Sequence, residues 1–310
     1  MPDMNTSPSD LVLPNLILIG AQKSGSTAVY DWLSQHPDIY GNPAMKDFPF
    51  FCKPEYFDKG LQWFSRHFKG HRNEPIVLHG YVHYLFLADE VAARLKALNP
   101  ELKLLVLLRN PVERAFSGYL QACKTGNESI PTFEEALKAD QSGELHTLRE
   151  IVDRSYLTHG MYAEQLEAYL EYFPRDQIHI EFYDDIRSEP AECCERLFRF
   201  IGVDPGFQPQ LRRKNVYGKP RFAAVERAIQ KGLPKGLVHK LIPLSLRTRL
   251  RQKVRAANTA PANKPAMNPA TRAQLIDFYR DEISRLEALT GRDLESWREA
   301  APAPRDPATP

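Results

Sequence analysis

The stretch 16–33 constrains the fold more than any other part of this chain. An apolar run, 16–19, leads through a turn of polar and small residues into a segment with helical spacing. That order predicts a buried strand, a tight loop and a helix. Glycines in such a turn let backbone N–H groups converge, and the positive end of the following helix faces the same point. The stretch therefore predicts a binding site for phosphate or a similar anion.

The loop departs from the ordinary nucleoside-triphosphate loop, G-x-x-x-x-G-K-[ST]. Gly20 and Gly25 have the spacing of that motif, but Ser26 stands where the motif has its lysine. A lysine lies inside the loop instead, at Lys23. We therefore expect the ammonium group of this lysine to lie beside the bound anion.

A second departure lies at 104–108, an apolar run that predicts another buried strand. It ends in Arg109 rather than in an aspartate that could hold magnesium. In doubly wound sheets ligands bind at the carboxyl ends of the strands, so we expect Arg109 and the loop to face the same crevice. Both departures favour a site that meets anions without a metal.

Two motifs together resemble those of sulfotransferases that use 3′-phosphoadenosine 5′-phosphosulfate, in the branch of glycan (heparan-sulfate type) enzymes and their bacterial relatives. QKSGST, at 22–27, is similar to the family's 5′-phosphosulfate loop. LLRNPVERAFSGY, at 107–119, is similar to the 3′-phosphate element, in which an arginine and a serine eight residues later hold that phosphate. The resemblance implies an α/β fold with a P-loop-type, doubly wound parallel sheet flanked by helices.

The resemblance also assigns residues to the sulfonate donor. Those that would bind the nucleotide are Gln22, Lys23, Ser24, Gly25, Ser26, Thr27, Arg109, Ser117, Tyr183, Lys219 and Arg221. Tyr183 begins an element similar to one whose tyrosine lies near the adenine, and the last two fall where the family has a basic loop over the nucleotide. Lys23 is also catalytic, because it is placed to neutralise the charge that grows on the bridging oxygen.

Three residues compete for the role of general base. Asp47, in MKDFPFF, stands where the glycan branch has a glutamate, and its shorter side chain requires a closer acceptor. His79 and His83 are its rivals, because the cytosolic branch uses a histidine from the region upstream of the arginine strand. The sequence lacks the Glu-Lys-(Thr/Ser)-Pro pattern that glycan members commonly carry there. The choice of base stays open.

The expected function is metal-free, in-line transfer of a sulfonate group to a hydroxyl of a carbohydrate or a small molecule. Two alternatives remain: a P-loop kinase-like phosphotransferase, and a protein that keeps the nucleotide pocket but has lost catalysis. The kinase would need a magnesium ligand and a lysine after Gly25, which the sequence does not offer.

Composition fits one soluble enzyme domain. Of 310 residues, 43% are hydrophobic, which is ample for a core, and the net charge of +2 leaves only local basic pockets to attract anions. The four cysteines show no disulfide or zinc spacing and suit a reducing compartment. No stretch reads as a signal peptide or reaches the roughly 18 apolar residues of a membrane span. We expect a cytoplasmic protein of bacterial origin that binds no nucleic acid.

The expected organisation is a sulfotransferase domain between two disordered ends. The predicted segments are a lead at 1–12, the domain at 13–297 and a tail at 298–310, with a mobile flap at 127–153, a long amphipathic helix at 156–173, a basic helical segment at 227–257, a linker at 259–269 and a closing helix at 271–289. Residues 227–255 include many basic residues and no acidic ones. This part could contact a membrane surface or an acidic glycan.

Overall fold

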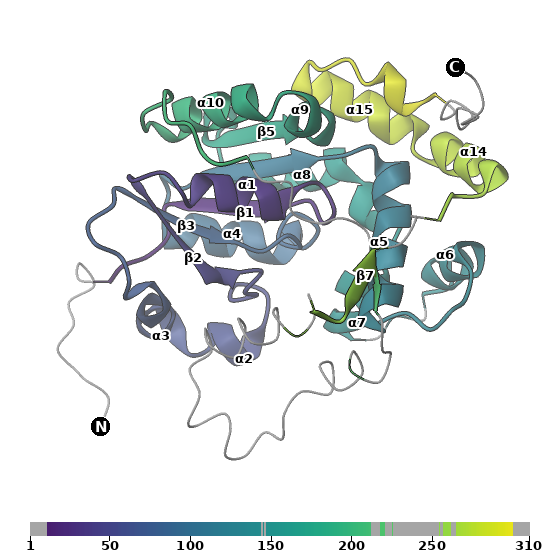
Figure 1. Cartoon of the computed structure of the whole chain (residues 1–310), viewed down its shortest axis with the longest axis horizontal. Coiled ribbons are helices and arrows are strands. Elements are labelled where there is room, and N and C mark those ends of the chain that lie inside the picture. The colour runs from purple at the N-terminus through teal and green to yellow at the C-terminus, as the bar shows by residue number, and fades with distance from the viewer. Residues whose placement is uncertain are drawn as a thin grey trace.

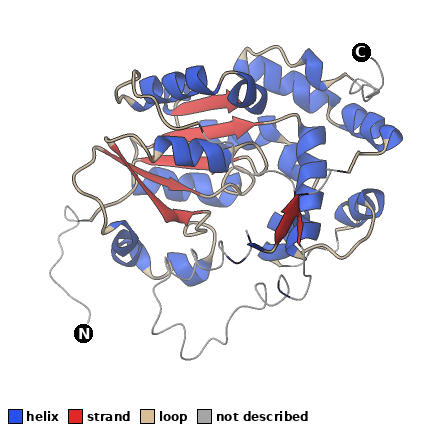
Figure 2. Ribbon diagram, viewed as in Figure 1, coloured by secondary structure: helices blue, strands red, loops and turns tan. Residues whose placement is uncertain are grey.

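The centre of the protein is a sheet of five parallel strands in the order β2-β3-β1-β4-β5, as the computed structural model shows (Figures 1 and 2). The structure describes residues 11–143, 145, 147–211, 218–220, 225, 254, 257–261 and 265–299. The strands are β1 Leu16–Gly20, β2 Ile39–Lys46, β3 Ile76–Gly80, β4 Lys103–Leu108 and β5 Ile178–Phe182. The predicted fold class, a parallel α/β sheet flanked by helices, is confirmed.

Helices lie on both faces of this sheet (Figure 2). Their bounds are α1 Ser26–Leu33, α2 Pro54–Phe57, α3 Gly60–Ser65, α4 Ala88–Leu98, α5 Pro111–Thr125, α6 Phe133–Gln141, α7 Leu148–Arg154, α8 Tyr162–Leu170, α9 Tyr183–Ser188, α10 Pro190–Ile201, α14 Pro269–Phe278 and α15 Arg280–Thr290. A second, antiparallel sheet pairs β6 (Gly218–Pro220) with β7 (Thr259–Pro261).

Strands β1 and β4 are apolar, apart from Lys103 at the start of β4, because both of their faces are covered. Alternate residues of β1 belong to different cores: Ile17 and Ile19 pack with α4 and α8, whereas Leu16 and Leu18 pack with α1 and α10. Parallel sheets buried in this way read as continuous apolar runs rather than as alternating ones. This explains why the sequence pattern at 16–19 and 104–108 predicts strands so clearly.

The chain order places a switch point beside β1. From β1 the chain leads to β2 and β3 on one side of the sheet, and then returns to place β4 on the other side. In open α/β sheets the crevice at such a point, outside the carboxyl ends of the strands, is where ligands bind. The loop after β1 and Arg109 after β4 both lie at these ends.

Three predicted segments have a different structure. The stretch 127–153, predicted to be a mobile flap, contains helices α6 and α7. Each has a side-chain cap: Thr132 Oγ1 accepts from the backbone N–H of Glu135, and Thr147 forms a capping box with Glu150. These short-range signals were present in the sequence, but the polar composition concealed them.

The predicted helix 156–173 begins later, because a 3₁₀ turn, Thr158–Gly160, precedes α8. A Cβ atom on Gly160 would lie 2.7 Å from the Tyr279 hydroxyl oxygen and 2.9 Å from Cβ of Pro111. The chain therefore passes so close to Tyr279 and Pro111 at this turn that there is room for glycine but not for a side chain. The predicted closing helix is likewise two helices, α14 and α15, which meet at Tyr279.

The predicted boundaries stay predictions. Residues 1–10 and 300–310 lie outside the described part, as does almost all of the basic segment 227–257. Within the predicted linker, 259–261 form strand β7. Among the described residues, no helix has the length and apolar character needed to cross a bilayer.

Candidate active site

The loop after β1 turns sharply before α1. Lys23 and Gly25 have positive φ angles, 70° and 92°, which is the left-handed backbone region. At Gly25 an added Cβ would also lie 3.4 Å from the Tyr183 ring. Both the positive φ angle and the limited space therefore favour glycine at this position. Helix α1 begins directly at Ser26, and its first N–H groups have no partners within the helix. The local sequence thus builds the predicted turn and helix start, and anion binding there stays a prediction.

Arg109 joins the second motif to this loop. Its Nη1 donates a hydrogen bond to the backbone oxygen of Lys23 at 3.1 Å, and its guanidinium carbon lies 4.5 Å from the centre of the Tyr183 ring. Its Nη2 lies 3.7 Å from a carboxylate oxygen of Glu113, which is itself paired with Arg272 of α14. Carbonyl, carboxylate and ring therefore fix the guanidinium beside the loop, as predicted from the strand order.

Helix α5 runs alongside the loop. Lys23 Nζ donates to the side-chain oxygen of Gln121 at 3.2 Å, and Arg114 Nη1 donates to that of Gln22 at 3.4 Å. Gly118 lies between these contacts, since a Cβ there would be 3.4 Å from the same Gln22 oxygen. Ser117 lies on this helix between Arg114 and Gln121 and is partly buried. Helix α5 runs beside the loop, as a shared anion contact with Arg109 would require, and the role of Ser117 stays a prediction.

Sequence reasoning missed two loop contacts that come from α5. Arg114 is 1% exposed, and its Nη2 donates to the backbone oxygen of Tyr156. A buried guanidinium that also holds Gln22 adds positive charge beneath the loop. Gln121 was missed as the partner of Lys23. The available signal was the spacing of Arg114, Gly118 and Gln121, which places all three on one helical face.

Asp47 lies just after β2, where its backbone N–H donates to the carbonyl of Gly80 at 2.7 Å. Its φ angle is 63°, and its side chain is 49% exposed. One carboxylate oxygen is 2.6 Å from Lys46 Nζ. The carboxylate is therefore paired with a cation, reachable from solvent and placed at the carboxyl ends of the strands.

His83 lies in the turn after β3. The backbone N–H groups of Tyr81 and Leu85 donate to Leu18 and Ile19, which fixes this turn against the end of β1. Burial lowers the pKa of His83 to about 4, and the nearby Asp47 carboxylate opposes that shift. His83 and Asp47 thus lie close enough to interact electrostatically.

His79 is fully enclosed. It is 0% exposed, its Nε2 lies 3.2 Å from the Tyr84 hydroxyl, and the rings of Phe51 and Phe64 surround it. Burial lowers its pKa to about 3. A group enclosed by these rings has no route to a substrate proton, so the geometry does not support His79 as a base.

Of the remaining predicted residues, Ser24 is buried in the loop, Ser26 is buried at the start of α1, and Tyr183 lies beside Gly25 of the loop. Lys219 is described only as backbone in β6, and Arg221 lies outside the described residues. In the part of the chain that is described, no three His, Cys, Asp or Glu side chains gather as a metal site would require.

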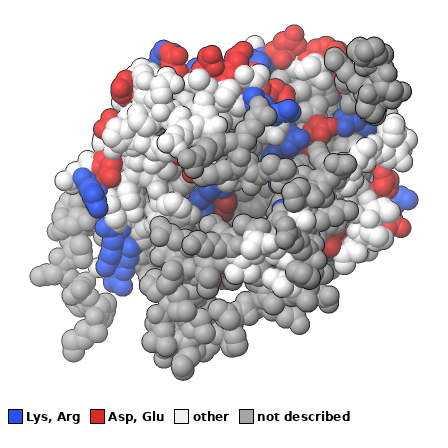
Figure 3. Space-filling model, in the orientation of Figure 1, with Lys and Arg blue, Asp and Glu red and all other residues white. Residues whose placement is uncertain are grey.

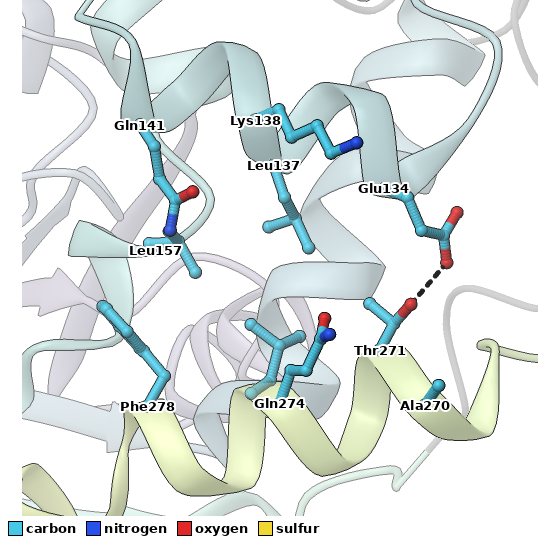
Figure 4. Close-up of a pocket in the computed structure, with 10 residues that line it drawn as sticks. Glu134, Leu137, Lys138, Gln141, Leu157, Ala270, Thr271, Gln274 and Phe278 are labelled. Atoms are coloured by element: carbon cyan, nitrogen blue, oxygen red, sulfur yellow. Dashed lines mark hydrogen bonds between the residues drawn. The ribbon is translucent and has the colours of Figure 1, made fainter.

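A cavity of about 510 Å³ lies elsewhere, between α6 and α14 (Figure 4). Its lining residues are Glu134, Leu137, Lys138, Gln141, Leu157, Ala270, Thr271, Gln274, Leu275 and Phe278. None of them belongs to the phosphate loop or to the Arg109 element.

The surface view shows acidic side chains gathered along the edge over α10 and α15 (Figure 3). Attraction of an anion therefore depends on local charges such as Lys23 and Arg109.

The family of the chain follows from a match to a family model described as a sulfotransferase domain, over residues 13–217. The chain belongs to the sulfotransferase family. Mouse heparan sulfate glucosamine 3-O-sulfotransferase 5 is 30% identical over 201 residues, which cover 63% of this chain and 56% of that protein. Human bifunctional heparan sulfate N-deacetylase/N-sulfotransferase 2 is 30% identical over 206 residues, which cover 62% of this chain and 22% of that protein.

Among solved structures, this sulfotransferase chain resembles a sulfotransferase from Alicyclobacillus acidocaldarius. The TM-score is 0.69 at 26% identity, and the match covers 93% of this chain and 100% of the other. The chain spans about half the length of the mouse relative, 56%, so the curated match concerns one part of that protein.

Proposed function

We propose that the chain transfers a sulfonate group from 3′-phosphoadenosine 5′-phosphosulfate to a hydroxyl of a carbohydrate or a small molecule. The observation that carries this proposal is the hydrogen bond from Arg109 to the Lys23 carbonyl, because it joins the two phosphate-binding motifs at one crevice. Membership in the sulfotransferase family supports the donor. The heparan sulfate relatives support a carbohydrate acceptor.

The donor would lie across the crevice between β1 and β4. Backbone N–H groups of the loop and the hydroxyls of Ser26 and Thr27 would hold the 5′-phosphosulfate. Arg109 and Ser117 would hold the 3′-phosphate, and Tyr183 the adenine side. Lys219 and Arg221 are kept as proposed contacts that cover the nucleotide.

The chemistry needs one cation and one base. As the acceptor oxygen bonds to sulfur, the bond from sulfur to the bridging oxygen breaks, and its electron pair stays on the bisphosphate product. Lys23 would neutralise that oxygen. Gln121 holds the ammonium group through an uncharged amide oxygen, so it orients the charge without cancelling it.

Asp47 and His83 remain the proposed bases, and variants can separate them. Asp47→Asn and His83→Gln each remove one proton acceptor while keeping similar volume. General-base catalysis typically contributes 10²–10⁴-fold, so kcat should fall by about that much for the base and little for the other residue. Unchanged affinity for adenosine 3′,5′-bisphosphate would show that the donor site is intact in each variant.

Calorimetric titration with adenosine 3′,5′-bisphosphate, alongside ATP and with chelator present, tests the proposed donor. We expect tight binding of the bisphosphate and turnover of the donor in chelator. Preference for ATP with magnesium would instead indicate a kinase-like phosphotransferase. Bisphosphate binding with no transfer to any hydroxyl acceptor would indicate a protein that has lost catalysis.

Lys23→Ala separates chemistry from binding. Because the charge on the bridging oxygen develops only during transfer, this variant should lose turnover far more than nucleotide affinity. Lys96→Ala is a matched control, since Lys96 is on α4 and donates to the Pro100 carbonyl, away from the loop. Normal turnover by Lys23→Ala would contradict the proposed role.

The wider setting is proposed from sequence alone. It comprises a cytoplasmic location, a bacterial source, the domain limits 13–297 and membrane contact through 227–255. Flotation with anionic vesicles, repeated after charge reversal within 227–255, tests the last of these.

A further inference from the structure

Two buried histidines from distant segments, one in the turn after β3 and one before α8, share a hydrogen bond. His83 Nδ1 and His159 Nε2 are 3.0 Å apart, although 76 positions separate them in the chain. His159 is 3% exposed, and its ring stacks on Phe86 with centroids 3.7 Å apart. Its other nitrogen, Nδ1, lies 2.8 Å from the backbone oxygen of Ser155. The three groups form a chain that ends at a carbonyl.

The carbonyl decides where each proton lies. A carbonyl oxygen only accepts, so His159 Nδ1 must carry hydrogen. Burial, with Arg114 and His83 nearby, holds the pKa of His159 well below its usual range, so the ring is neutral and Nε2 has a lone pair. That lone pair can only accept from His83, and therefore His83 Nδ1 carries hydrogen. In a neutral His83, the remaining nitrogen, Nε2, is then an acceptor.

The surroundings of His83 agree with a neutral ring that is open at one nitrogen. The ionisable groups that act on it are Asp47 from the end of β2, Arg114 from α5 and His159, and the Tyr81 ring lies 5.1 Å away. Within the described part of the chain, Nε2 makes no hydrogen bond, and it is not among the enclosed polar atoms that lack a partner.

We infer that His159 is a positioning residue that fixes His83 with hydrogen on Nδ1, so that Nε2 accepts the hydrogen bond of the acceptor hydroxyl during sulfonate transfer. This role rests on the proposed function. When the hydroxyl oxygen bonds to sulfur, its proton moves to His83 Nε2, the bond from sulfur to the bridging oxygen breaks, and the bisphosphate leaves with the electron pair of that bond.

Nitrogen-15 NMR of the imidazoles in the full-length protein tests the tautomer directly. The His83 signals are assigned as those lost in His83→Gln. We expect a protonated Nδ1 and an unprotonated Nε2 in the unmodified protein at neutral pH. Hydrogen on Nε2 instead would overturn the inference, whatever the enzymatic activity.

Two variants test the action of His159 on His83. His159→Phe keeps a ring over Phe86 but removes the acceptor, and should shift His83 toward the other tautomer and lower kcat about tenfold to a hundredfold. His159→Gln can still accept through its amide oxygen and should recover most of that rate. His36→Phe is the matched control, a buried histidine that packs against Phe198 on the other face of the sheet.

The outcomes separate the two proposals. An unmodified protein that binds the bisphosphate but transfers no sulfonate would end the proposed function, while the tautomer could still be as stated. Full activity with unchanged His83 signals in His159→Phe would end this inference alone. If His159→Phe does not fold, two measurements still test the inference. One is the tautomer of His83 in the unmodified protein. The other is kcat of His159→Gln compared with that of His159→Ala, and equal rates would contradict the inference.

Discussion

Replacing Arg109 by alanine should weaken the binding of adenosine 3′,5′-bisphosphate strongly. The Arg109 side chain is only 14% exposed, and Tyr183 and the Lys23 carbonyl fix its direction. A charge-assisted hydrogen bond in such a setting contributes about 1.5–3 kcal/mol, which corresponds to roughly tenfold to 150-fold in affinity. Removal also takes away one of the two arginines that neutralise Glu113, so the loss should lie toward the upper end.

Calorimetry at fixed, moderate salt measures this loss, because exposed charge contributions are screened and would otherwise confuse the comparison. The control is Arg187→Ala. Arg187 lies 5.9 Å from the same Tyr183 ring, but no hydrogen bond to the loop is seen for it among the described residues. We expect it to change affinity less than about threefold, in line with an exposed pair. Binding by a folded Arg109→Ala protein within twofold of the unmodified protein would refute this reading of the site.

Three further predictions concern the loop, the enclosed histidine and a close backbone approach. Gln121→Leu should lower kcat more than nucleotide affinity, because Lys23 loses a hydrogen-bond acceptor that orients its ammonium group. Equal losses in steady-state kinetics and calorimetry would contradict this. His79, with a pKa of about 3, stays neutral in the folded state while the unfolded imidazole takes up a proton below about pH 6.5. The contribution of His79 to the free energy of unfolding should therefore be fully present above pH 6.5 and fall by up to about 1.4 kcal/mol per pH unit as the pH drops. In urea unfolding, the free energy of His79→Gln should depend less steeply on pH than that of the unmodified protein. Gly160→Ala should cost about 1–3 kcal/mol in unfolding free energy, because its methyl group would meet Tyr279; a change below about 0.5 kcal/mol would show that the contact relaxes.

The geometry of the loop on the proposed donor side could be predicted from sequence because it depends on the local chain. Gly20, Gly25 and Lys23 act through backbone turns and a helix end that lie within ten residues. Arg109 follows from the end of a strand. Anion recognition of this kind needs few residues at fixed spacing, so a short motif contains most of it.

The acceptor side could not be predicted in the same way, because it depends on contacts between distant segments. Nothing in the sequence distinguishes His79 from His83, although one is enclosed by rings and the other adjoins the loop. The difference arises because strand residues alternate between faces, while the turn that follows redirects its side chains. The partner of His83, His159, lies on a 3₁₀ turn that the helical pattern concealed.

Helix α5 shows why donor and base sides of such a site are coupled. One face of the helix contacts Lys23 through Gln121 and Gln22 through Arg114, and the charge of Arg114 also acts on His83 and His159. Burial is the main cause of the low pKa of both histidines, and the positive charge of Arg114 adds to it because it disfavours protonation of either ring. Loss of that charge, for example in Arg114→Met, should weaken bisphosphate binding and raise the pKa of His83 together. A variant in which only one of these properties changed would show that the two sides are independent.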